Sequence, residues 1–250
     1  MATAVAHPSP AKSAPVLPGR RYDHYFFTGM AILMAATVFA GFAPSYYMAG
    51  MFHAPLPSLT IHLHGAIFTG WVLLFIAQTS LVSAGRVDIH RKLGVGGFFY
   101  ACLMVVIGVL AATDSLVRQA GPPGRDPKFF YIIPLSDMLI FATLIYFGFR
   151  ARRDSPAHKR IMLVATIDLL IAAIARLPLA FVHRNAAHAG MVSYMFLLLL
   201  VAYDLWSTRT VHRATLWAGA LMVFIYQIRI PLGKTAAWHA FATWVQSIAR

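Results

Sequence analysis

The sequence is poor in cysteine and in charged residues, and both shortages exclude certain kinds of site and classes of protein. Its single cysteine, Cys102, lies within an apolar run, which excludes a disulfide framework, a thiolate metal site and covalent haem attachment. Only 12% of the residues are charged, whereas a soluble domain carries about a quarter. The chain also lacks repeated His-x-x-His-His boxes, which argues against a diiron desaturase. The low charged fraction indicates that lipid surrounds most of the chain.

Long apolar runs take the place of charge. The sequence is 59% hydrophobic with a mean hydropathy of +0.67. A helix needs about 20 apolar residues to cross roughly 30 Å of hydrocarbon. Seven runs reach this length, so the sequence predicts an all-α integral membrane protein with seven transmembrane helices within residues 22–234. These runs are residues 25–49, 58–83, 93–117, 130–150, 160–182, 189–207 and 214–233.

Basic residues gather in alternate breaks between the runs, and this asymmetry predicts the orientation. About thirteen Lys and Arg lie in the N-terminal segment and in the second, fourth and sixth breaks, against about six on the other side. The positive-inside bias therefore places the N-terminus in the cytoplasm and the C-terminus in the periplasm. Because the net charge of +13 lies between membrane segments, we expect contacts with the bilayer and its anionic headgroups, and no nucleic-acid partner.

The two ends of the chain differ in composition from its centre. Residues 1–21 are rich in Pro, Ala and Ser, which predicts a disordered cytoplasmic tail. Residues 235–250 contain Trp238 and Trp244 among scattered polar residues, as in a short helix at the membrane interface. Between the ends, histidine recurs beside Lys or Arg at His90, His158 and His212, each near the start of an odd-numbered run. This weak repeat favours one lone helix followed by three related helical hairpins.

Eleven histidines against eight acidic residues suggest haem b as a cofactor. Ligation by two histidines needs imidazoles on facing helices, and spacing alone leaves several pairings open. The candidates are His64 with His183 or His188 for an outer haem, and His90 with His158 or His212 for an inner one, with His24 as a further inner ligand. For the three inner histidines the alternative is a structural role among the lipid headgroups, because each adjoins a basic residue.

A second candidate site is an intramembrane polar cluster around Arg176. This arginine lies about two turns inside the outer boundary of its run, where an unpaired charge is costly. Asp137 is at a similar depth and is the expected counter-ion, with Asp168 as the second choice. His64 lies at the same level, and Gln227 from the last run completes the predicted cluster. The alternative is an ion pair that only orients the helices.

Two segments carry a resemblance to a known group of proteins. The segments GRVDIHRKLG (residues 85–94) and HKRIMLVATIDLLIAAIAR (residues 158–176) resemble a family of uncharacterised multi-pass bacterial membrane proteins. That family has His-Arg-x-Leu-Gly after a glutamine-bearing helix, then a His-Arg/Lys-Arg-x-Met helix that ends in arginine. The resemblance implies a bacterial inner-membrane location and no particular activity. The matching residues are Gln78, His90, Arg91, Leu93, Gly94, His158, Arg160, Met162 and Arg176.

These patterns favour a membrane protein that binds haem b or carries out proton-coupled redox chemistry, with histidines near both faces. The alternative from another class is a cofactor-free carrier or sensor of a small molecule, built on the intramembrane His, Asp and Arg residues. A membrane scaffold without a site is the third hypothesis. The sequence identifies no catalytic residue.

Overall fold

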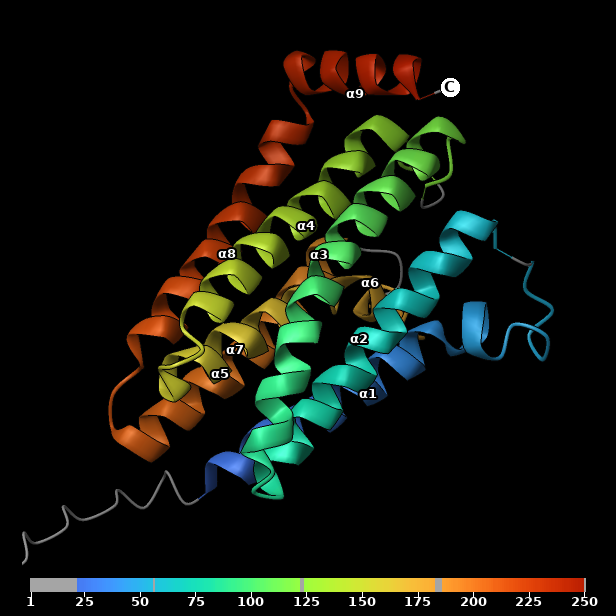
Figure 1. The fold of residues 1–250 in the computed structure, drawn as a ribbon. Coiled ribbons are helices and arrows are strands. Elements are labelled where there is room, and N and C mark those ends of the chain that lie inside the picture. Colours follow the sequence, from blue (N-terminus) through green and yellow to red (C-terminus); the bar gives the residue numbers. More distant parts are fainter. Residues whose placement is uncertain (1–21, 56, 122–123, 183–185, 250) are drawn as a thin grey trace, which may run out of the picture.

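The computed structural model describes residues 22–55, 57–121, 124–182 and 186–249 (Figure 1). Within these ranges the chain is helical and contains no strand. Six helices are long and apolar enough to cross a membrane, so the chain is an all-α, multi-pass membrane protein, as its hydropathy predicts. The predicted tail at residues 1–21 and the candidate ligand His183 lie outside the described residues.

Three short turns define one end of the helical bundle. Residues 84–86, 151–154 and 209–212 form these turns, and α1 starts beside them (Figure 1). We call this the turn end and the opposite end the far end. The six long helices are α1 (Asp23–Phe42), which continues as the π-helix η2 (Ala43–Tyr47), α2 (Leu59–Ser83), α3 (Val87–Val117), α4 (Pro127–Arg150), α7 (Ala186–Thr208) and α8 (Arg213–Gly233).

The fifth predicted span, residues 160–182, is not one continuous helix. It consists of α5 (Ser155–Asp168), a break, the single turn α6 (Ile171–Ile174) and irregular chain. With 14 residues, α5 is only about 21 Å long. At the break the backbone tightens, and the N–H of Leu170 donates to the carbonyl of Ile167 at 3.0 Å. Hydropathy alone predicted a regular span here because the residues on both sides of the break are equally apolar.

Protein surrounds this broken segment. Leu163, Ile167 and Ile174 are fully buried. Helix α5 packs against α4, α7 and α8, and α6 packs against α1 and α7. The approach of α1 depends on Gly41, because a Cβ atom at that position would lie 2.2 Å from the carbonyl oxygen of Ala173. Non-helical backbone is tolerated at membrane depth where neighbouring helices shield it from lipid, and this packing supplies that shield.

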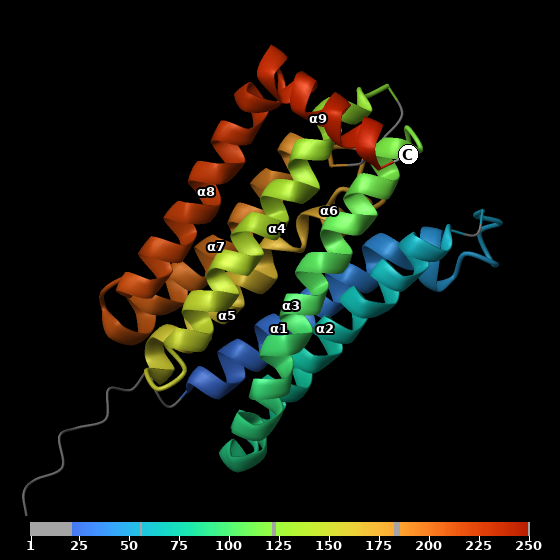
Figure 2. The same ribbon diagram turned by 45° about the horizontal axis from the view of Figure 1, so that its top comes forward.

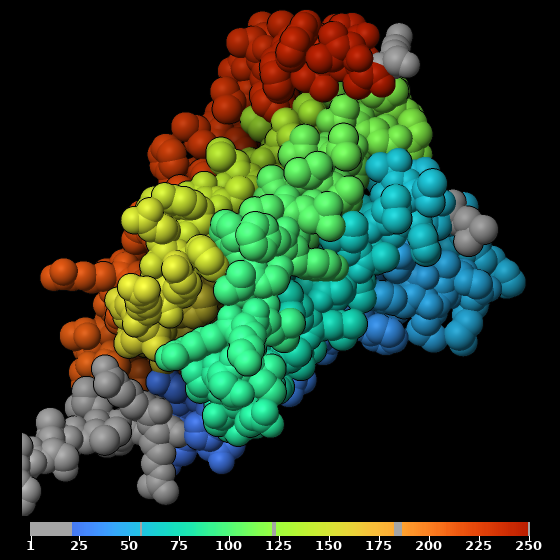
Figure 3. Space-filling model, viewed as in Figure 1, coloured from blue at the N-terminus to red at the C-terminus, as the bar shows by residue number. Residues whose placement is uncertain are grey.

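The last helix, α9 (Ala236–Ile248), turns away from α8 and lies across the far end of the bundle (Figure 2). The indole N–H of Trp238 donates to the carbonyl of Lys128 at 2.8 Å, and the amide of Gln246 donates to the carbonyl of Leu116 at 3.2 Å. These bonds fasten α9 over the ends of α3 and α4, as the space-filling view also shows (Figure 3). Its range matches the predicted C-terminal helix, and its position at a membrane interface stays a prediction.

Candidate functional site

A buried ion pair joins α4 to α8 inside the bundle. Nη1 of Arg229 lies 2.5 Å from Oδ1 of Asp137 and also donates to the hydroxyl of Ser136 at 3.2 Å. The two charged side chains are 4% and 10% exposed. Asp137 lies about 15 Å along α4 from its first residue, well inside a 24-residue helix that is long enough to cross a membrane. A charged pair at this depth is costly, and such pairs in membrane proteins commonly mark functional sites.

A second carboxyl group, that of Asp168, lies beside this pair. Asp168 is the last residue of α5, directly before the break, and is 0% exposed. Neither of its carboxyl oxygens accepts a hydrogen bond of ordinary geometry within the described chain, although the Tyr226 hydroxyl lies near the carboxyl group. Its backbone carbonyl does have one, because the Tyr226 hydroxyl donates to it at 3.1 Å. The Tyr226 ring also lies 3.9 Å from the Arg229 guanidinium carbon, so α8 supports both the break and the arginine.

The four residues Asp137, Asp168, Tyr226 and Arg229 form what we call the core cluster. It holds two carboxyl groups and one guanidinium group in a space closed to solvent. If both acids were ionised, the cluster would carry one uncompensated negative charge. An isolated buried charge is so unfavourable that the group takes up a proton or binds a cation instead. The arrangement is therefore suited to binding and releasing one positive charge.

The structure does not assemble the polar cluster that the sequence predicts. Asp137 pairs with Arg229 rather than with Arg176, and Asp168 does not pair with Arg176 either. Arg176 is exposed and donates to the carbonyl of Ala172 at 2.7 Å. Two further members of the predicted cluster have other environments: the His64 ring lies against Phe68 at 4.1 Å, and the Gln227 amide donates to the Tyr194 hydroxyl at 3.0 Å.

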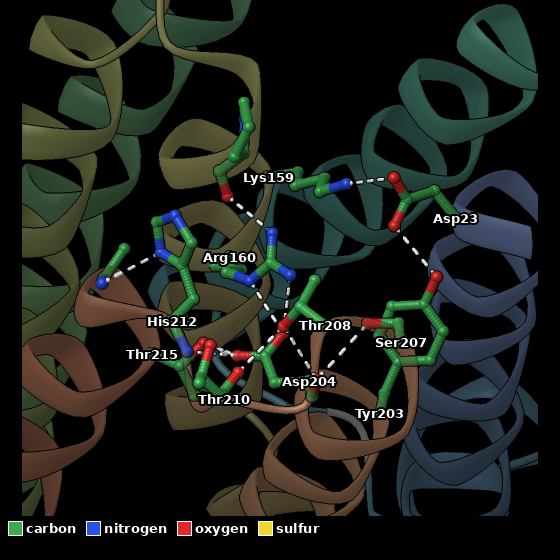
Figure 4. A network of polar contacts seen from close by, with 12 residues as sticks. Asp23, Lys159, Arg160, Tyr203, Asp204, Ser207, Thr208, Thr210, His212 and Thr215 are labelled. Atoms are coloured by element: carbon green, nitrogen blue, oxygen red, sulfur yellow. Dashed lines mark hydrogen bonds and ion pairs between the residues drawn. The ribbon is translucent and has the colours of Figure 1, made fainter. Parts of the chain in front are cut away.

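A polar network lies at the turn end and is centred on Asp204 of α7 (Figure 4). Its Oδ1 accepts from Nε and Nη2 of Arg160 at 2.8 and 2.5 Å, and the two side chains are 0% and 3% exposed. Its Oδ2 accepts from the backbone N–H of His212 at 3.1 Å and from the Thr215 hydroxyl at 2.6 Å. Asp204 thus has partners on both oxygens, in contrast to Asp168.

The same end of the bundle is tied to α1. Lys159 lies 2.5 Å from Oδ2 of Asp23, whose other oxygen accepts from the Tyr203 hydroxyl at 2.8 Å (Figure 4). Together with the Asp204 contacts, these bonds connect α1, α5, α7 and α8 where their chains enter the bundle. Such a fully satisfied network fixes the relative positions of helices.

His212 caps the start of α8 through its ring. Its Nδ1 accepts from the N–H of Ala214 at 3.1 Å, so this nitrogen is unprotonated. Burial lowers the pKa of His212, the positive charge of Arg160 lowers it further, and Asp204 acts in the opposite direction. A shallow hollow of 590 Å³ lies beside this cap and the turn before it.

Among the predicted haem ligands, the structure brings His90 and His158 together. Their ring centroids are 6.2 Å apart. Nδ1 of His158 donates to the carbonyl of Gly148 at 2.8 Å, since a carbonyl can only accept. When the Gln78 amide is oriented with its oxygen towards the Gly94 N–H, its nitrogen donates to Nδ1 of His90 at 2.6 Å. Each ring is thus held by a hydrogen bond at its Nδ1 atom, and each Nε2 atom remains for another partner.

The other candidate ligands have separate roles. His188 lies with Nδ1 2.5 Å from the carbonyl of Phe181 and stacks on the Phe181 ring, and His212 serves as the cap described above. An outer pair that includes His183 lies outside the described residues. No group of three or more His, Cys, Asp or Glu side chains suited to a metal ion occurs in the described part of the chain.

Comparison with protein-family models, with curated proteins and with solved structures finds no match.

Two features of the site escaped sequence reasoning. The sequence does not indicate Arg229 as the partner of Asp137, because α4 and α8 are far apart along the chain. It does not indicate Asp204 either, because this residue lies near the end of an apolar run. The available signal is the same in both cases: a charged residue within a span needs a partner, and only four arginines, Arg150, Arg160, Arg176 and Arg229, lie inside the predicted spans.

Proposed function

We propose that this chain is a proton-coupled membrane carrier whose proton-binding group is the carboxyl of Asp168. One observation carries the proposal: Asp168 is completely buried, neither carboxyl oxygen accepts a hydrogen bond from the described residues, and the side chain lies beside an acid–arginine pair at the break of a helix. In a structural ion pair, such as Arg160 with Asp204, both carboxylate oxygens accept hydrogen bonds. Carriers commonly place their coupling sites at discontinuous helices near the middle of the membrane.

The charge balance gives the mechanism. With Asp137 paired to Arg229, Asp168 carries a proton and the core cluster is neutral. Release of that proton leaves two carboxylates competing for one guanidinium group, a state that requires another cation or a new arrangement of α5 and α8. Binding one proton or one other cation at a time is the basis of exchange. In this proposal the break after Asp168 is the point at which the segment changes between two arrangements.

The path of the chain supports seven crossings. Helix α4 ends at the turn end and α7 begins at the far end, so the broken segment α5–α6 connects opposite ends of the bundle (Figures 1 and 2). If the six long helices span the membrane, this segment is the seventh crossing. The proposed orientation keeps the turn end in the cytoplasm, in keeping with its basic residues.

Charge displacement after a pH jump tests the carrier proposal without knowledge of the substrate. Proteoliposomes with the full-length protein are adsorbed on a solid-supported membrane, and the external pH is stepped. We expect a transient current from proton movement to Asp168 that disappears in Asp168→Asn. The control Asp114→Asn changes an acid that pairs with Arg118 at the partly exposed end of α3 and should keep the current. An unchanged current in Asp168→Asn would overturn the proposal.

A second candidate function, haem b binding, has the His90–His158 pair as its support. The two ring centroids are 6.2 Å apart. These imidazoles would hold the haem iron, and the haem would supply one-electron redox chemistry. Protein purified from haem-replete cells should then show a reducible Soret band that His158→Ala abolishes. A colourless folded protein contradicts this second candidate and leaves the first unaffected.

A further inference from the structure

Two shallow hollows adjoin at the turn end of the bundle. The first, with a volume of 590 Å³, lies between the turn that precedes α8 and the start of α5. The second, of 410 Å³, lies between α4, α5 and α8. Asp154 lines both hollows, so they form one depression, which we call the turn groove. The turns that precede α5 and α8 lie side by side in both ribbon views (Figures 1 and 2). The lining residues that matter here are Phe147, Arg150, Asp154, Arg213 and Trp217.

An exposed arginine lines each part of the turn groove. Arg150 is the last residue of α4 and lines the second hollow, and Arg213 is the first residue of α8 and lines the first. Within the described chain the Arg213 side chain forms no hydrogen bond or ion pair, and Arg150 donates from Nη1 to the Tyr146 hydroxyl at 3.4 Å. A guanidinium group has five N–H donors, so both side chains can donate to a ligand in the groove.

The turn groove carries an excess of positive charge. Among the described residues that line it, Asp154 is the only acid, and its Oδ1 accepts from the N–H of Ala157 at 3.3 Å as the cap of α5. The two turns contribute further exposed arginines, which are Arg152, Arg153 and Arg209. Basic pockets between membrane helices at the cytoplasmic side attract anionic lipid headgroups.

Aromatic residues line the groove one turn deeper than the arginines. Phe147 lies three residues before Arg150 on α4, and its ring is 5.0 Å from that of Trp217. Trp217 lies four residues after Arg213 on α8. Each aromatic residue is therefore about one helical turn, roughly 5 Å, further from the turn end than the arginine of its own helix. Both remain accessible, since Phe147 is 44% and Trp217 is 41% exposed.

We propose that the turn groove binds an anionic phospholipid of the surrounding bilayer, with its headgroup at Arg150 and Arg213 and its acyl chains against Phe147 and Trp217. The order of the groups matches that of a phospholipid, because charge lies at the helix ends and apolar rings lie deeper. A guanidinium fork forms charge-assisted hydrogen bonds with phosphate oxygens. The site lies outside the core cluster, and lipid binding there does not depend on proton transfer at Asp168.

Native mass spectrometry tests the proposal on the full-length protein. The protein is released from mixed micelles that contain equal amounts of phosphatidylglycerol and phosphatidylcholine with identical acyl chains. We expect the wild type to retain phosphatidylglycerol about tenfold or more over phosphatidylcholine, because two arginines face the headgroup. Arg150→Gln together with Arg213→Gln should bring this ratio close to one. Arg150→Lys with Arg213→Lys should give an intermediate ratio, since the charges stay but the planar forks are lost.

A matched variant at the same end separates a site from general surface charge. Arg91→Gln with Lys92→Gln removes two exposed positive charges near the start of α3, outside the turn groove, and should keep the lipid preference. Both double glutamine variants should keep the wild-type melting temperature without lipid, because the replaced side chains are exposed. Trp217→Ala keeps both groove arginines and should weaken phosphatidylglycerol binding several-fold.

Three results would overturn the proposal. The first is a wild-type protein without lipid preference. The second is an equal loss of preference in the Arg150/Arg213 and Arg91/Lys92 variants, which would assign it to the charge of the whole turn end. The third is a dimer in the lipid-free spectrum that the Arg150/Arg213 variant dissociates, which would make a second copy of the chain the occupant. Asp168→Asn should retain the preference, so failure of the carrier proposal and failure of this site are distinguishable.

Discussion

At the scale of single residues, the functional contrast is between two buried aspartates. Asp204 accepts four hydrogen bonds from Arg160, His212 and Thr215, as a structural acid does. Asp168 accepts none at its carboxyl oxygens from the residues that the structure describes. Both are completely buried, so burial does not separate them. The two acids differ in the hydrogen bonds that their carboxyl oxygens accept. A buried acid without such bonds is stable only in its neutral form, and it can exchange its proton when its surroundings change.

When Asp137 is mutated, Asp168 should take its place as the counter-ion of Arg229. In Asp137→Asn the charge on Arg229 loses its partner, and Asp168 can release its proton and replace it. We therefore expect a modest loss of stability in each single asparagine variant. The double variant leaves Arg229 with no counter-ion, and breaking a buried pair in this way costs about 3–5 kcal/mol. Denaturation in detergent should show a loss in the double variant larger than the sum of the single losses; additive losses would mean that the acids do not share Arg229.

At the scale of helices, the turn-end network holds α5, α7 and α8 together. Asp204→Asn removes the charge that Arg160 needs, and we expect a loss of about 3–5 kcal/mol in the free energy of unfolding. Asp114→Asn breaks an acid–arginine pair of the same kind, but one that is partly exposed within α3, and should cost less than about 1 kcal/mol. Similar losses in the two variants would contradict the structural role given to Asp204.

The start of α8 should be sensitive to acid through His212. Because the pKa of His212 is lowered in the folded protein, the unfolded chain binds a proton at this ring more readily. The contribution is fully present above the ordinary histidine pKa of about 6.5 and is lost as the pH falls below it. The melting temperature should therefore drop on acidification. His212→Asn keeps a capping acceptor without a titrating ring, and an equal drop in that variant would exclude His212 as its origin.

The sequence predicted helices well and their interruptions poorly. Hydropathy finds α4 or α8 because length and composition alone make a span. It cannot find the break after Asp168, because Leu169 and Leu170 are as apolar as the helix around them. The hydrogen bond from the Tyr226 hydroxyl to the Asp168 carbonyl at the break joins residues far apart in sequence. The sequence also cannot predict which charged residues form ion pairs. Asp137 and Arg229 meet only because α4 packs on α8, and no local sequence pattern shows which helices are neighbours.

At the scale of the whole molecule, topology decides whether the broken segment crosses the membrane. With the N-terminus inside, seven crossings put the C-terminus outside, whereas six would leave it inside. Reporter fusions after Arg153, after Arg125 and at Ala249 should thus be cytoplasmic, periplasmic and periplasmic, respectively. A cytoplasmic reporter at Ala249, together with the expected result at the other two sites, would show that α5 and α6 do not cross.

The infrared absorbance of protonated carboxyl groups shows whether Asp168 holds a proton. A neutral carboxylic acid has a carbonyl stretch that a carboxylate lacks, and the full-length protein in lipid can be measured at neutral pH, where exposed aspartates are ionised. We expect a band from a protonated, buried carboxyl that is lost in Asp168→Asn and retained in Asp204→Asn. A wild-type protein without this band, or an Asp168→Asn variant that keeps it, would contradict the assignment of Asp168 as the proton-binding group.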